Sequence, residues 1–110
     1  MTTEQIINEI INTSTGHLIF SDPTLASNYF NRQNEQQIAV LRTRDNAGSI
    51  MLNKLQKLSQ MSADEFDKDF VANGQQWSAL IHLLSLDCFL EQLSDTEFAE
   101  LQKIMADRLD

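Results

Sequence analysis

Apolar residues recur along this chain at the spacing of helices. Two isoleucine pairs, at positions 6–7 and 10–11, lie four positions apart, which places them on one stripe of a helix and does not fit the alternation of a strand. The same spacing recurs further along, at Ile38 and Leu41, at Met51, Leu55 and Leu58, and at Phe98, Leu101, Met105 and Leu109. These stripes predict an all-α fold.

Polar residues mark where the predicted helices begin and end. Start signals are the capping pairs Thr2 with Gln5, Ser62 with Glu65 and Ser94 with Glu97, the Ser21-Asp22-Pro23 segment, and a capping serine at Ser49. Stop signals are Gly16, the turn-like cluster 45–48 and Asn73-Gly74. An apolar connector is expected at 17–20, and the amide-rich stretch 31–37 is either a break or an exposed helix face. We predict a single domain over residues 1–110, an irregular or orthogonal bundle of six or seven short helices.

The most apolar segment, residues 75–93, changes its apolar face part of the way along. Trp77, Leu80, Ile81, Leu84 and Cys88 cluster on one side, whereas Leu86, Phe89, Leu90 and Leu93 cluster on nearly the opposite side. Asp87 and Glu91 fall on the stripe that Leu80 and Leu84 begin. Either the helix breaks near residues 85–87, or one helix exposes an acidic patch flanked by apolar residues. Because a buried unpaired carboxylate is costly, we expect Asp87 at the surface or paired.

The amino-acid composition favours helices, and no motif indicates a catalytic, metal-binding or phosphate-binding site. Leu, Met and Ala total 26 of the 110 residues, whereas Val occurs twice. His17, His82 and Cys88 lack the spacing of metal ligands, and a lone cysteine excludes a disulfide within the chain. Acids at 64–69 are explained by helix capping, and the three glycines form no phosphate-binding loop. We therefore expect no catalytic residue, no metal, no cofactor and no enzymatic activity.

The sequence also argues against nucleic acid and membrane as partners. Residues 66–84 have the outline of a helix-turn-helix, but no Lys or Arg lies between Lys68 and Lys103 to anchor phosphates. No apolar stretch approaches the ~20 residues that span a bilayer, and the N-terminus lacks the basic region of a signal peptide. We expect a cytoplasmic protein that binds neither DNA directly nor a membrane.

The charge is divided unevenly along the chain. The formal net charge is −8, from 16 acidic and 8 basic residues. Residues 58–110 hold eleven acids and three bases, whereas residues 1–41 sum to −3 and residues 42–57 to +3. An acidic surface of this kind either only keeps the protein soluble or attracts a basic partner. For the second case, the predicted partner-binding residues are Asp64, Asp67, Asp69, Leu86, Asp87, Leu90, Glu91, Asp95 and Glu100.

The chain resembles in type the small acidic all-helical immunity proteins of bacterial contact-dependent and other polymorphic toxin systems. The resemblance is carried by the 110-residue length, the acidic stretches Asp64–Asp69 and Asp87–Glu100, and the apolar segment Trp77–Leu93. It implies a stoichiometric inhibitor that binds a basic toxin domain, often a nuclease, and covers its active site or substrate groove. The alternatives are a phage-derived inhibitor of a host nucleic-acid enzyme and a helical oligomerisation or regulatory subunit, and the sequence leaves the oligomeric state open.

Overall fold

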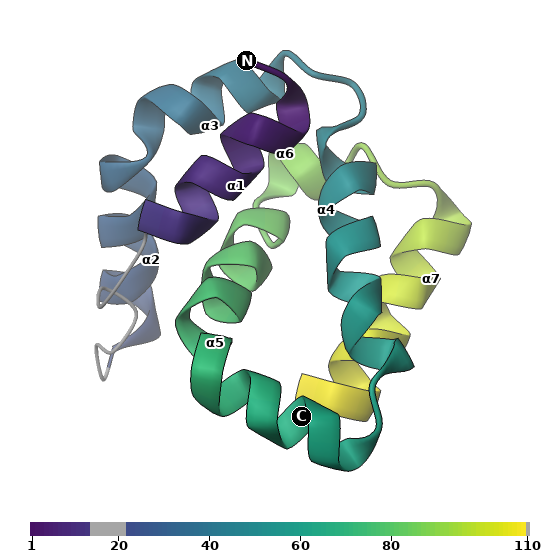
Figure 1. The fold of residues 1–110 in the computed structure, drawn as a ribbon. Coiled ribbons are helices and arrows are strands. Elements are labelled where there is room, and N and C mark those ends of the chain that lie inside the picture. The colour runs from purple at the N-terminus through teal and green to yellow at the C-terminus, as the bar shows by residue number, and fades with distance from the viewer. Residues whose placement is uncertain (14–21, 110) are drawn as a thin grey trace.

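The computed structural model describes residues 1–13 and 22–109 and has the all-α architecture that the sequence predicts (Figure 1). Over these residues the chain forms helices and no strand. The α-helices are α1 (Thr3–Thr13), α2 (Pro23–Gln33), α3 (Glu35–Arg42), α4 (Ala47–Leu55), α5 (Ala63–Leu84), α6 (Asp87–Leu90) and α7 (Asp95–Ile104). A short 3-10 helix, η1 (Gln56–Gln60), follows α4, and a π-helical turn, η2 (Met105–Leu109), follows α7. The predicted stop at Gly16 and the connector at 17–20 lie outside the described residues.

Capping side chains begin the helices where the sequence predicts them. Before α1, the Gln5 backbone N–H donates to Thr2 Oγ1 at 3.1 Å, and the Thr2 N–H donates to Gln5 Oε1 at 2.8 Å. Ser94 and Glu97 form the same reciprocal pair before α7, which satisfies backbone donors that have no partner within the helix. Asp22 before α2 and Ser62 before α5 are confirmed as N-caps too.

The predicted cap at Ser49 is wrong, because α4 already begins at Ala47. Asn46 precedes the helix without a capping side-chain bond. Instead, the Gly48 N–H donates to Gln92 Oε1 at 2.7 Å, and the Ser49 hydroxyl donates to Glu97 Oε2 at 2.8 Å. The first turn of α4 is therefore capped by Gln92, from the segment that joins α6 to α7, and the Ser49 side chain additionally links it to α7.

The predicted helix end at Asn73-Gly74 is a kink within α5. Asn73 has φ −129° and ψ 19°, outside the helical region, yet the helix resumes and runs on to Leu84. One carboxylate, that of Asp69, accepts a hydrogen bond from Asn73 Nδ2 at 3.0 Å and a short one from the Trp77 indole N–H. Asp69 thus links the two sides of the kink. The segment whose sequence has the outline of a helix-turn-helix is therefore one bent helix.

Of the two alternatives for residues 75–93, the structure has the first, a break near residues 85–87. Ser85 ends α5, Leu86 has an extended backbone at φ −69° and ψ 135°, and α6 begins at Asp87. This turn lets both apolar clusters of the segment reach the core, since Leu80 and Leu84 of the first and Phe89 of the second are buried. The Asp87 side chain is exposed, as expected for a carboxylate without a basic partner. The amide-rich stretch is also broken, at Asn34 between α2 and α3.

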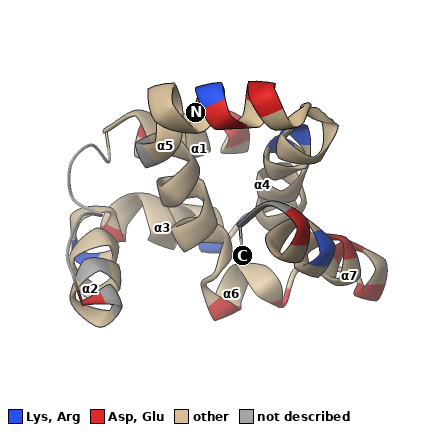
Figure 2. Cartoon of the chain, turned by 90° about the horizontal axis from the view of Figure 1, so that it is seen from below, with Lys and Arg blue, Asp and Glu red and all other residues tan. Residues whose placement is uncertain are grey.

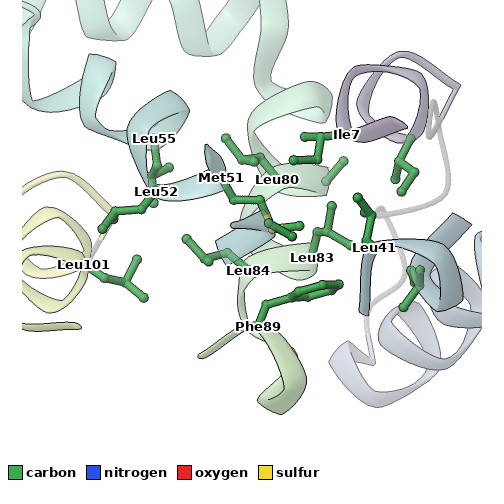
Figure 3. Close-up of a cluster of buried hydrophobic side chains, with 14 of the residues drawn as sticks. Ile7, Leu41, Met51, Leu52, Leu55, Leu80, Leu83, Leu84, Phe89 and Leu101 are labelled. Atoms are coloured by element: carbon green, nitrogen blue, oxygen red, sulfur yellow. The ribbon is translucent and has the colours of Figure 1, made fainter. Parts of the chain in front are cut away.

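A single core joins the helices (Figure 3). α4 packs against α1, α5, α6 and α7, so its apolar residues occupy the centre of the bundle. Each fully buried apolar side chain of this size contributes about 1.5–3 kcal/mol through its removal from water. The labelled members of the core in Figure 3 are Ile7, Leu41, Met51, Leu52, Leu55, Leu80, Leu83, Leu84, Phe89 and Leu101.

The apolar face predicted for the last helix is partly wrong. Leu101 and Ile104 are buried on α7, whereas the Phe98 side chain is 40% exposed. Met105 is half-buried and begins η2, where the helix widens and the stripe loses its spacing. No helix among the described residues is long and apolar enough to cross a membrane.

The half-buried His82 provides a test of how α2 packs on α5. Its ring lies 5.7 Å from that of the buried Phe30, and burial lowers the pKa of His82 below its ordinary value of 6.5. The unfolded chain therefore takes up a proton at His82 before the folded chain does. We expect the free energy of unfolding to be fully retained above pH 6.5 and to fall as the pH drops below it.

Urea denaturation at about pH 7 and about pH 5 measures this dependence. His82→Leu is the matched variant, and its free energy of unfolding should change less over this interval than that of the parent protein. Glu97 does not complicate the comparison, because its pKa is lowered from 4.5 by hydrogen bonds from Ser94 and Ser49 and it titrates further into acid. Equal pH dependence in both proteins would contradict the assignment to His82.

Candidate protein-binding surface

The structure divides the nine predicted partner-binding residues into two groups at opposite ends of α5 (Figure 1). The first group, Asp64, Asp67 and Asp69, lies near the start of α5. The second group lies around α6 and in α7, and consists of Leu86, Asp87, Leu90, Glu91, Asp95 and Glu100. Figure 2 shows acidic positions on both α6 and α7, which follow each other closely in the chain. The members around α6 are therefore separated from the first group by the length of α5, whereas α7 runs back toward η1, the segment that precedes α5.

One acid of the first group has a clear role within the chain. Asp69 is half-buried and is engaged by Asn73 and Trp77 across the kink. Asp64 lies in the first turn of α5, where a negative charge interacts favourably with the helix dipole, as Asp87 and Asp95 do in α6 and α7. Asp67 is exposed and lies next to Lys68 in the sequence. The first group therefore differs from the second in holding a basic residue among its acids.

The second group forms an exposed acidic surface. Asp87, Glu91, Asp95 and Glu100 are all exposed, and none has a Lys or Arg nitrogen within 4 Å in the described part of the chain. No Lys or Arg occurs between Lys68 and Lys103. Both leucines of the group, Leu86 and Leu90, are half-buried against the core. The α6–α7 acidic surface, as we name these six residues, combines unpaired carboxylates with partly exposed apolar groups.

Glu97 lies on α7 but has a different role. Its carboxylate accepts hydrogen bonds from the Ser94 N–H at 3.0 Å and from the Ser49 hydroxyl at 2.8 Å, and these bonds lower its pKa. Ser49 belongs to α4, so Glu97 ties α7 to the centre of the bundle. The sequence identified Glu97 as a capping residue but gave no sign of this second, distant contact.

A groove of about 450 Å³ borders the acidic surface. It lies between α3 and the start of α6, with Asn31 of α2 at its wall. Leu86 and Asp87 line both the groove and the α6–α7 acidic surface, which makes the two features continuous. Asp87 is joined there by two charged residues of α3, Glu35 and Arg42. The sequence did not single out Asn31, Glu35 or Arg42, because no local pattern connects α3 with a segment some fifty residues later.

A further property of the described part of the site is its content of metal ligands and reactive groups. The described residues contain no group of three His, Cys, Asp or Glu side chains arranged to hold a metal ion. Cys88 is a free, half-buried thiol at the groove. Fold and site together define a small all-α domain with an acidic, apolar-flanked surface. No family model, curated protein or solved structure matched the chain.

Proposed function

We propose that this protein is a stoichiometric inhibitor that binds a basic protein partner, such as a toxin nuclease domain, through the α6–α7 acidic surface. The observation that carries the proposal is a stretch without Lys or Arg, between Lys68 and Lys103, on which four exposed carboxylates, at 87, 91, 95 and 100, have no basic partner in the described structure. Unpaired charges of one sign speed the encounter with a partner of opposite sign and set its orientation. The resemblance to immunity proteins is consistent with this function.

The alternative function is a helical oligomerisation module, since interface cores are apolar. The exposed large apolar side chains among the described residues are Met1 before α1, Leu25 and Tyr29 on α2, Val40 on α3, Val71 on α5 and Phe98 on α7. Of these, Met1 and Val40 line one groove between α1 and α3. None of the six belongs to the α6–α7 acidic surface, so the two candidate functions place the interface on different residues.

The proposal is tested by reversing two charges on the α6–α7 acidic surface. Affinity capture with the parent protein, from the cells that make it, should yield a one-to-one complex with a basic protein. With that purified partner, Asp87→Lys combined with Glu91→Lys is expected to lower the association rate constant about tenfold or more at low salt. The difference should shrink as salt is raised, because ions screen the attraction. Stopped-flow fluorescence measures the rate, and circular dichroism checks that helicity is retained.

A second pair of substitutions, Asp64→Lys with Asp67→Lys, makes the same change of charge at the other end of α5. The proposal requires a much smaller loss of association rate from this pair than from the pair on α6. If the α5 pair has the larger effect, the interface lies at the start of α5 and the proposed surface is wrong. If the captured partner keeps its full activity at equimolar inhibitor, binding occurs without inhibition and the proposed function is wrong.

A further inference from the structure

We infer that the groove between α3 and α6 receives an arginine side chain of the basic partner. This inference deepens the proposed function and rests on it, since it names the chemical group that the site recognises. The groove is a cavity of about 450 Å³, within the range of pockets that bind small ligands or single side chains with their flanking backbone. It continues the α6–α7 acidic surface through Leu86 and Asp87.

Negative charge reaches the groove from two separate helices. Glu35 lies in the first turn of α3, and Asp87 lies in the first turn of α6. Both side chains are exposed, and neither has a basic group within 4 Å among the described residues. Carboxylates held on two helices form hydrogen bonds to one guanidinium more readily than to one ammonium, because the guanidinium spreads five N–H donors over a rigid plane.

An unsatisfied acceptor lies in the same wall. The Oδ1 atom of Asn31 is buried and has no hydrogen-bond partner in the described structure, although the residue lines the groove. Burial of an acceptor without a donor is unfavourable. Asn31 as a whole is half-buried and lines the groove, so a donor bound there lies beside its amide. A guanidinium supplies such a donor.

Apolar residues complete the fit for a long aliphatic stem. Ile38 and Leu86 contribute apolar surface to the groove, and Ile38 is almost fully buried. Arg42 also lines the groove, two helical turns beyond Glu35, roughly 10 Å along α3 at 1.5 Å per residue. Its positive charge disfavours a cation at that end. The guanidinium is therefore expected beside Glu35 and Asn31, with the stem of the side chain along Ile38 and Leu86.

The inference is tested on the full chain with N-acetyl-arginine amide as the probe. In proton–nitrogen correlation NMR, its titration should shift the resonances of Asn31, Glu35, Leu86 and Asp87 in a saturable manner. N-acetyl-citrulline amide has nearly the same shape without the charge and should bind about tenfold more weakly. Glu35→Gln should weaken binding of the arginine probe by a similar factor. Glu9→Gln, which neutralises an exposed carboxylate of α1, should leave it unchanged.

Three results would overturn the inference: shifts that do not saturate, shifts spread evenly over all acidic helices, or equal binding of the citrulline probe. The outcome for the proposed function is separate. If Glu35→Gln leaves partner affinity intact while reversal of Asp87 and Glu91 abolishes it, the partner uses the acidic surface without the groove, so the inference fails and the function stands. If the arginine probe binds in the groove but no basic partner is inhibited, the function fails and the arginine site stands as a property of the fold.

Discussion

Phe89→Ala is expected to lower the free energy of unfolding by about 3–5 kcal/mol. Phe89 is the fully buried aromatic residue of α6, and Figure 3 shows its ring in the core beside Leu83 and Leu84. Removing the ring takes away its burial and leaves a cavity that the surrounding helices fill only in part. Since small domains are stable by about 5–15 kcal/mol in total, this loss is a large share of the stability.

Phe98→Ala is the matched control for this prediction. It deletes the same ring from α7, where the side chain is 40% exposed, and should cost about 1 kcal/mol or less. Urea denaturation followed by far-ultraviolet circular dichroism gives both values. Equal losses in the two variants would show that α6 is not packed into the core, and would remove the support for both the acidic surface and the groove.

Gly48→Ala is expected to destabilise the protein by about 1–3 kcal/mol, although alanine is normally the better helix former. A Cβ atom at position 48 would lie 2.7 Å from the Phe89 carbonyl oxygen, closer than real Cβ contacts allow. That oxygen belongs to the backbone of α6, so α6 has to move away from α4. The movement would also strain the bond from the Gly48 N–H to Gln92.

Gly74→Ala provides the opposite case within the same protein. A Cβ atom there would meet only the Phe70 ring, at 3.9 Å, which is an ordinary contact. Without a clash, the helix propensity of alanine should raise the free energy of unfolding by up to about 1 kcal/mol. The same substitution is thus expected to have opposite signs at the two glycines. Stabilisation at both positions would mean that α4 and α6 lie further apart than described.

Features of the fold that depend on near neighbours in the sequence could be predicted. The capping pairs at Thr2 and Ser94 need only residues three positions apart, and both form. The break before Asp87 follows from a change of apolar face within one segment, which a pattern of single residues reveals. The all-α class could be predicted in the same way, because the apolar stripe of each helix is visible in the sequence without knowing which helix it packs against.

Features of the fold that depend on contacts between distant residues could not be predicted from the sequence. The start of α4 is capped by Gln92 and reinforced by Glu97, which lie 44 and 48 positions from their partners Gly48 and Ser49. The kink at Asn73 is a local feature that resembles a helix end in sequence, because Asn-Gly is a common stop signal and the bridging Asp69, four and eight positions from Asn73 and Trp77, shows no such role in the pattern.

The candidate site, too, could be predicted from the sequence only in part. The acids of α6 and α7 could be identified from the sequence, since their lack of nearby Lys or Arg is visible there. That the acids at the start of α5 lie apart from them could not be seen, since it follows from the length and direction of α5. The groove was missed altogether, because Glu35 and Asp87 come together only through the packing of α3 beside α6.

The chain between Lys68 and Lys103 also determines which reagents can reach the proposed interface. Trypsin cleaves after lysine and arginine, so residues 69–103 leave the protein as one peptide that contains α6 and most of α7. Reagents that join lysine to lysine find no side-chain amine between Lys68 and Lys103, the latter lying on α7 three residues after Glu100. Coupling of carboxylates to amines is the chemistry that would link Asp87 or Glu91 to a basic partner, and the linked pair would appear on that single long peptide.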